Sequence, residues 1–289
     1  MNLRHIFLAL LVPALWGLGF ALAKVGMDRF PPFMIMSMRF ALSALVLVWF
    51  VKPPVGHMRQ IFLIALVSAT IQYGFTFYGL RNLDASTAVI VVQLEAPFLA
   101  LLGAVFLRER LGWKKIFGMV LAFGGVGLIA GEPRLDGSLL YIGMIATGTL
   151  TWAIGQLMIR NLREVGGMTM LAWVSAFAAP QMLIASLVLE TGQMDAIANA
   201  SPEQWGIVLY LGLIMTAIGY TAWYTLVKSV SFSSIAPFLM LTPVTTLIFG
   251  YFVIGDVFTP IMAVGALMVL VGIAITTIQR RAPIQAASD

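Results

Sequence analysis

The chain of 289 residues contains no cysteine and only two histidines, His5 and His57. Without cysteine it forms no disulfide and no thiolate metal site, and it has no thiol nucleophile. No HExxH or GxSxG pattern occurs, so neither a zinc peptidase nor a serine hydrolase is indicated, and no phosphate-binding loop is present for ATP. We therefore expect a protein that is not an enzyme and that carries no metal and no cofactor.

Charge is also scarce. Charged residues make up 10% of the chain and hydrophobic residues 61%, whereas an average soluble domain has about 25% charged residues. Ten apolar runs, bounded by charge, proline or glycine, approach the ~20 residues that cross a bilayer as a helix, and they leave no room for a soluble domain. We predict an all-α polytopic membrane protein with spans near 6–26, 33–51, 61–80, 85–106, 114–131, 138–159, 168–189, 205–227, 233–254 and 260–278.

The first run has a second interpretation. Arg4 precedes an apolar stretch that ends in Ala21-Leu22-Ala23, which is a pattern also found in secretory signals. Trp16 and Gly19 in this run recur in the sixth run, and a cleaved leader would not require that match. We therefore interpret the run as the first membrane span.

The chain contains an internal duplication. Leu15-Trp16-Gly17-Leu18-Gly19 recurs as Thr151-Trp152-Ala153-Ile154-Gly155, and Pro97 recurs as Pro243. The offset is 136 residues at the start (16 to 152) and 146 later (97 to 243), so about ten residues are inserted in the second copy. Each copy holds five spans, an odd number, and therefore the second copy must be inverted in the membrane. We predict two inverted repeats, 1–134 and 135–289, around a central cavity, an organisation typical of transporters that alternate between two membrane faces.

The basic residues are unevenly distributed between the two sides of the predicted bundle. Twelve of the 17 lie on the side of the N-terminus, four lie opposite, and Arg39 lies within a span. By the positive-inside rule both termini are cytoplasmic, and the net charge of +5 reflects topology, not nucleic-acid binding. The twelve are Arg4, Lys52, Arg59, Arg108, Arg110, Lys114, Lys115, Arg160, Arg163, Lys228, Arg280 and Arg281.

Two charged residues lie at membrane depth, where such groups are costly. Arg39 is about six residues into the second span, and Glu95 is about ten residues into the fourth, or ~15 Å below its start. The pair can form a structural ion pair that locks the first repeat. Alternatively, either residue can face a water-filled cavity and bind substrate charge or a proton. For Arg39 we favour the structural role, and for Glu95 both interpretations stay open.

Proline stands at matching positions in the fourth and ninth spans. Glu95-Ala96-Pro97 corresponds to Leu241-Thr242-Pro243, and Pro237 adds a second possible bend to the ninth span. Proline removes a backbone donor, and interrupted helices at equivalent places in two repeats point to a site at the membrane midplane. The competing interpretation is a kink that serves packing alone.

Aromatic and amide side chains gather in the spans next to these prolines. A cavity walled by such groups suits amphipathic solutes with an apolar or aromatic body, or flat cations attracted by Glu95. Tyr78 and Tyr224 lie near span ends and also fit an interfacial belt. The predicted solute-binding residues besides Glu95 are Trp16, Gln72, Tyr73, Tyr78, Trp152, Gln156, Tyr220, Trp223 and Tyr224.

Glycines repeat in the fifth and tenth spans. Gly118 and Gly125 correspond to Gly265 and Gly272 at an offset of 147 residues (118 to 265). Small residues at helical spacing let membrane helices approach closely, so we expect these two spans to be packing elements.

In these motifs the chain resembles the drug/metabolite transporter superfamily, in its ten-span form with two EamA repeats. The resemblance rests on Leu15-Trp16-Gly17, Arg39-Phe40-Ala41 and Glu95-Ala96-Pro97, on 106–111 before a glycine-rich span, and on Ile254-Gly255-Asp256-Val257. It implies a basket-like helical fold with a central cavity, cytoplasmic termini in a bacterial inner membrane, and export of small metabolites. The overall pattern is similar to the YddG-type aromatic amino-acid exporters.

We thus expect a secondary exporter or facilitator of amino acids, aromatic or neutral, that works by alternating access. Its site should lie between the repeats near the third, fourth, eighth and ninth spans. The alternative is an exporter of aromatic or cationic drugs that uses Glu95 as counter-charge. The expected partners are a small-molecule substrate and the lipid bilayer, not nucleic acid, and the sequence does not determine the oligomeric state.

Overall fold

The computed structural model describes residues 3–107, 112–132, 135, 137–162, 164–229, 238 and 241–277, with the side chains of 107, 224, 227–229 and 277 left aside. Every regular element in these ranges is a helix, and no strand occurs in them. Eight helices are long and apolar enough to cross a membrane, and two shorter apolar helices follow them. The predicted all-helical, polytopic membrane fold is confirmed.

The first five spans lie within a few residues of the predicted ranges. The third is one long helix with a π-helical middle, and the fourth is divided into two helices. The elements are α1 (Leu3–Gly26), α2 (Pro32–Leu47) with η1 (Val48–Phe50), η2 (Val55–His57) before α3 (Met58–Ala65), η3 (Leu66–Ile71), α4 (Gln72–Arg81), α5 (Ala85–Val92), α6 (Glu95–Leu107) and α7 (Trp113–Ala130).

The second five spans repeat this plan with one addition, the short helix α10 between the seventh and eighth spans. The change in repeat offset from 136 to 146 residues falls at this helix, so α10 and its loops account for the insertion. The elements are α8 (Leu139–Arg160), α9 (Gly167–Leu189), α10 (Gln193–Ala198), α11 (Pro202–Leu209), η5 (Tyr210–Ile218), α12 (Gly219–Ser229), α14 (Leu241–Phe249), η6 (Gly250–Ile254) and α15 (Pro260–Thr277).

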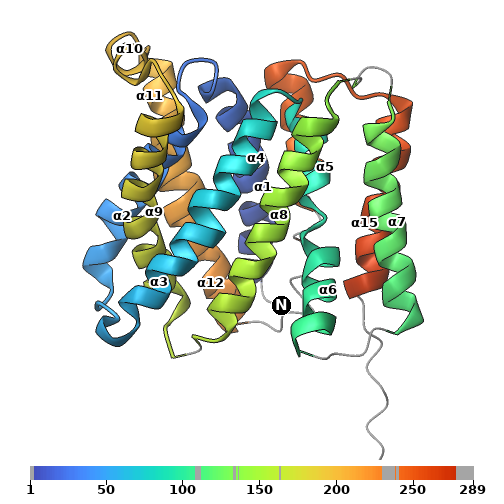
Figure 1. Cartoon of the computed structure of the whole chain (residues 1–289), viewed down its shortest axis with the longest axis horizontal. Helices are drawn as coiled ribbons and strands as arrows, with labels where there is room; N and C mark the ends of the chain where they lie inside the picture. The colour runs from blue at the N-terminus through green and yellow to red at the C-terminus, as the bar shows by residue number, and fades with distance from the viewer. Residues whose placement is uncertain are drawn as a thin grey trace, which may run out of the picture.

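The two halves run in opposite directions through the bundle (Figure 1). We call the face where α1 begins and α15 ends the terminal face, and the other, which carries α10, the opposite face. Helix α1 runs from the terminal to the opposite face, whereas α8, its counterpart, runs back. The repeats interdigitate: α2 packs on α9, α7 on α15, α8 on α4, and α1 on α12 and α14.

Glycine brings α7 and α15 into backbone contact. A Cβ on Gly118 would lie 2.6 Å from the carbonyl oxygen of Gly272, and one on Gly125 would lie 2.6 Å from that of Gly265. Lipid gives helices no hydrophobic drive to associate, so close packing supplies the attraction between them. The fifth and tenth spans are the packing elements that their glycine pattern predicts.

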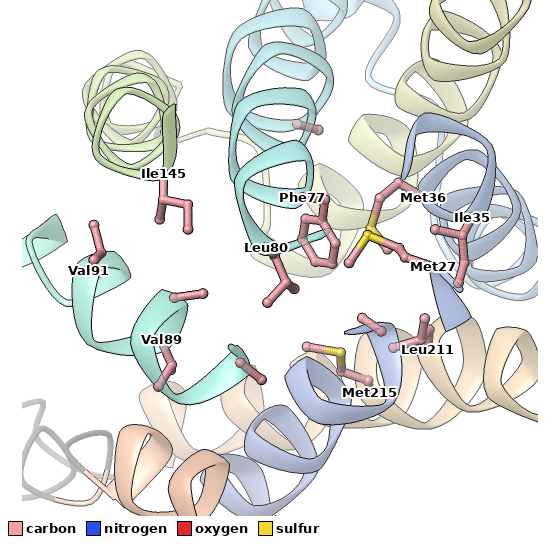
Figure 2. Packing of buried hydrophobic residues seen from close by; sticks show 14 of the residues in the cluster. Met27, Ile35, Met36, Phe77, Leu80, Val89, Val91, Ile145, Leu211 and Met215 are labelled. Atoms are coloured by element: carbon pink, nitrogen blue, oxygen red, sulfur yellow. The ribbon is translucent and has the colours of Figure 1, made fainter. Parts of the chain in front are cut away.

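The largest cluster of buried apolar residues among the described ones joins both repeats. Figure 2 shows this cluster, in which Met27 follows α1, Ile35 begins α2, Leu80 ends α4 and Leu211 belongs to η5. Helix α5, the opposite-face half of the fourth span, has all of residues 85–91 buried. In α6, the other half, only Pro97, Leu102 and Gly103 are buried among residues 95–106.

Candidate functional site

The fourth span is interrupted close to Pro97. Helix α5 ends at Val92, where the amides of Gln93 and Leu94 make tight i−3 hydrogen bonds of 3.1 and 3.0 Å, and α6 begins at Glu95. Pro97 is the third residue of α6, a first-turn position where the missing N–H is tolerated. Pro243 lies in α14, whose described part begins at Leu241. Pro237 lies outside the described residues.

Glu95 occupies the first turn of α6, where the positive end of the helix dipole favours a carboxylate. Its side chain is partly buried. The ion pairs of the described residues are Arg29 with Asp195 and His57 with Glu164, and neither involves Glu95. A partly buried carboxylate that forms no ion pair with a described residue is available to a cationic group of a solute.

Arg39 is held by the second repeat. It is 1% exposed, its Nε donates to Thr216 Oγ1 at 2.8 Å, and its guanidinium carbon lies 4.9 Å from the ring centroid of Tyr73 and 5.4 Å from that of Phe40. The ion pair with Glu95 that the sequence allowed is therefore not formed. The reason is packing: α2 lies against η5 and α9, which directs this side chain across the repeat boundary.

A neutral contact occupies the equivalent pair of spans. Thr70, in the π-helical η3, donates to Gln181 Oε1 of α9 at 2.7 Å. Thr70 and Thr216 are 146 residues apart, the later repeat offset, and Thr216 stands in the π-helical η5. π-Helical turns inside α-helices are frequent at functional sites. The sequence reasoning missed this pair, although matching threonines at the repeat offset were a usable signal.

Three predicted residues form one aromatic group between the repeats. The ring centroid of Trp16 on α1 lies 5.1 Å from that of Tyr220 and 6.1 Å from that of Trp223, both on α12. The indole Nε1 of Trp16 is buried and has no hydrogen-bond partner within the described part of the chain. A buried, unpaired donor costs roughly 1–3 kcal/mol, so this N–H is suited to a solute acceptor.

The aromatic group adjoins the start of α14. Thr245, two residues beyond Pro243, donates to the carbonyl of Pro13 at 2.8 Å, and Gly17 lies directly against the Thr245 side chain. Trp16 is therefore next to the proline-bearing turn of the ninth span, and α5 also packs on α14. Residues from both repeats thus meet where the fourth and ninth spans approach each other.

The remaining predicted residues lie elsewhere. Tyr73 stacks on Phe77 (5.2 Å between centroids) beside Arg39, and Gln72 is buried where α4 packs on α8, with its Nε2 3.2 Å from Thr76 Oγ1. On α8, Trp152 and Gln156 are half-buried. The Tyr224 side chain lies outside the described residues.

Tyr78 lies at a separate pocket of about 330 Å³ on the opposite face. Both repeats contribute to its wall, and an Arg29–Asp195 ion pair of 2.9 Å crosses between them. The lining residues are Arg29, Pro31, Tyr78, Arg81, Leu189, Glu190, Thr191, Gly192 and Asp195.

Comparison with known proteins places this architecture. Residues 3–131 and 139–278 each match the EamA-like transporter family. A "Probable amino-acid metabolite efflux pump" of Salmonella typhimurium is 29% identical, with 95% of each chain covered. A "Probable terminal-alkyne amino-acid exporter" of Streptantibioticus cattleyicolor is 27% identical over 93% of this chain and 92% of its own.

A solved crystal structure, 16% identical, covers 96% of this chain and 97% of its own with a TM-score of 0.65, and thus has the same fold. Both halves of the chain match one family model, and the structure is a multi-pass helical bundle. The chain therefore belongs to the EamA-like transporter family of the drug/metabolite transporter superfamily and carries two EamA repeats.

Proposed function

We propose that the protein is a secondary exporter of amino acids or similar small organic metabolites in a bacterial cytoplasmic membrane. Relatives similar over nearly their full length are named as an amino-acid metabolite efflux pump and an amino-acid exporter. We further propose that the terminal face is cytoplasmic, because it carries twelve of the basic residues against four opposite.

The observation that carries the proposal is the aromatic group of Trp16, Tyr220 and Trp223 beside the start of α14. Aromatic faces accept an apolar side chain, and the Trp16 Nε1–H can donate to a carboxylate.

Glu95 supplies the opposite charge. A partly buried carboxylate with no arginine or lysine partner among the described residues attracts the ammonium group of an amino acid. The same carboxylate can exchange this ammonium for a proton, which would couple export to the proton gradient. The second repeat has Leu241 at the equivalent position, so the charge at this site comes from the first repeat alone.

A preference for aromatic or neutral amino acids follows from the same arrangement. The three rings offer a large apolar surface to the side chain of such a solute. The alternative, export of flat aromatic cations, uses the same rings through cation–π attraction together with Glu95.

Proteoliposomes separate the two substrate classes. Purified protein is reconstituted into vesicles loaded with labelled phenylalanine, leucine or lysine, or with a flat aromatic dye cation, and efflux is followed against protein-free vesicles. We expect phenylalanine and leucine to leave faster than lysine. If only the dye leaves the vesicles and no amino acid does, amino-acid export is wrong and export of aromatic cations is supported.

A further inference from the structure

Two carboxylates of the second repeat bind the first turns of first-repeat helices at the opposite face. Glu190, directly after α9, accepts the backbone N–H of Phe33 at 2.9 Å and that of Met34 at 3.3 Å, at the start of α2. Asp256, directly after η6, accepts the backbone N–H of Ser86 at 2.9 Å and its hydroxyl at 2.8 Å, at the start of α5. The outer ends of the second and fourth spans are thus both held by the other repeat.

The hydrogen bonds that Glu190 and Asp256 accept are expected to be stronger than ordinary neutral hydrogen bonds. A helix start has unpaired N–H groups and a partial positive charge, and hydrogen bonds to an ionised acceptor are about twice as strong as neutral ones. Both carboxylates are at most 9% exposed, so water competes little for them. Each contact is specific as well as strong, because the N–H groups of a first turn point in fixed directions.

The chain around Asp256 is shaped to present this carboxylate. Gly255 adopts a left-handed conformation (φ 75°), and the N–H of Asp256 donates to the carbonyl of Gly250 at 3.0 Å. A Cβ on Gly250 would lie 2.7 Å from Asp256 Oδ2 and 2.8 Å from Ser86 Oγ, so only glycine leaves room there. The turn is therefore built for the interaction with α5.

The two faces of the bundle are fastened unequally. Val89 of α5, three residues after Ser86, belongs to the buried apolar cluster of Figure 2. Toward the terminal face, the ion pair between the repeats in the described part of the chain is His57 with Glu164 at 3.5 Å, and their side chains are 32% and 85% exposed. Exposed pairs of this kind contribute little. Among the described residues, the better-buried contacts between the repeats thus lie at the opposite face.

We propose that Glu190 and Asp256 are the gating residues of the outer face. They hold the path closed while the site is open toward the terminal face, and they release α2 and α5 when the repeats rock to open outward. Once released, both carboxylates regain water, which offsets the lost hydrogen bonds and allows two states of similar free energy. The inference rests on the proposed orientation of the transporter and is independent of its solute.

The absence of cysteine makes a direct test possible, because a single introduced cysteine is the only thiol to react. One reporter is Val89→Cys, a near-isosteric change at a 1% exposed position of α5. The other is Leu99→Cys, which lies one helical turn beyond Glu95 on the same side of α6 and is partly exposed. A membrane-impermeant maleimide is applied to intact cells and to inverted vesicles.

In the otherwise unchanged chain we expect the thiol at position 89 to be protected and the thiol at position 99 to react from the terminal side. Combining Glu190→Gln with Asp256→Asn should raise labelling at position 89 from the outside by about tenfold or more, the change that loss of about one charge-assisted hydrogen bond gives. Labelling at position 99 should fall in the same variant, because opening one face closes the other.

Asp195→Asn is the matched control. It removes a carboxylate from the same face, but one that is exposed and paired with Arg29, so labelling should not change. The proposed gating role would be wrong if labelling at position 89 did not change in the double variant. It would also be wrong if labelling rose at both positions together. Because no solute is added, a failure to transport amino acids leaves this outcome unaffected.

Discussion

Nε of Arg39, on α2 of the first repeat, donates a 2.8 Å hydrogen bond to Oγ1 of Thr216 in the π-helical turn of the eighth span. The equivalent spans of the other half are joined by neutral groups, Thr70 and Gln181, at 2.7 Å. A buried charge therefore ties one side of the repeat interface, and an amide ties the other. The two equivalent contacts between the repeats are therefore of unequal strength.

Arg39→Gln is expected to lower the free energy of unfolding by about 1.5–3 kcal/mol, the contribution of a hydrogen bond to a charged group. The cation–π contact with Tyr73 is lost as well. Thermal unfolding in detergent measures the change. Arg29→Gln is the control: its ion pair is exposed, so it should shift stability by less than about 1 kcal/mol. If the two variants lowered the free energy of unfolding equally, the buried contact between Arg39 and Thr216 would not be a stronger link between the repeats than the exposed ion pair.

Glu95→Gln keeps the shape of the side chain and removes its charge. If Glu95 binds the ammonium group, KM for amino-acid export should rise about tenfold or more, the value of one charge-assisted hydrogen bond. If it also carries the proton, the dependence of export on external pH should disappear. Glu203→Gln, an exposed acid of α11, serves as control. Normal KM and normal pH dependence in the Glu95 variant would remove both roles.

Trp16→Ala removes the centre of the aromatic group with Tyr220 and Trp223. Aromatic pairs contribute about 0.5–1.5 kcal/mol each, so KM for an aromatic amino acid should rise roughly 2- to 10-fold. Trp16→Phe should keep part of the affinity, whereas Trp49→Ala, at an 81% exposed position, should change nothing. If all three variants had the same KM, the solute would not bind at the aromatic group.

Gly272→Ala tests the backbone contact between α7 and α15. The new Cβ would collide with the carbonyl oxygen of Gly118 and lie 2.7 Å from the amide nitrogen of Ala122, so the helices must separate. We expect a loss of about 1–3 kcal/mol, as for other overpacked sites, and reduced yield of folded protein in size-exclusion chromatography. Gly127→Ala meets nothing within 4 Å and should be tolerated.

The proposed orientation predicts the side of the chain ends. A fluorescent protein fused to the C-terminus should fluoresce in cells, because that end is cytoplasmic, and a periplasmic phosphatase fused there should be inactive. Twelve basic residues against four support this arrangement. The opposite pair of results would invert both the export direction and the side from which the gate opens.

The sequence by itself determined the membrane fold and the duplication. Long apolar runs must become helices in lipid because only a helix satisfies its own backbone within one segment, and an odd number of spans forces inversion of the copy. The glycines of the fifth and tenth spans and the proline positions could also be read from the sequence, because a missing Cβ or a missing N–H acts through the backbone and does not depend on where a side chain points.

Only the tertiary structure decided which side chains meet. Arg39 and Glu95 stand at compatible depths in one repeat, yet Arg39 is bound by Thr216 of the other, because α2 packs on η5. The capping of α2 and α5 by Glu190 and Asp256 joins residues more than 150 positions apart, which no local pattern records. The direction in which each helix crosses the membrane can be read from the local sequence. Which face of a helix meets which neighbouring helix depends on packing between the repeats.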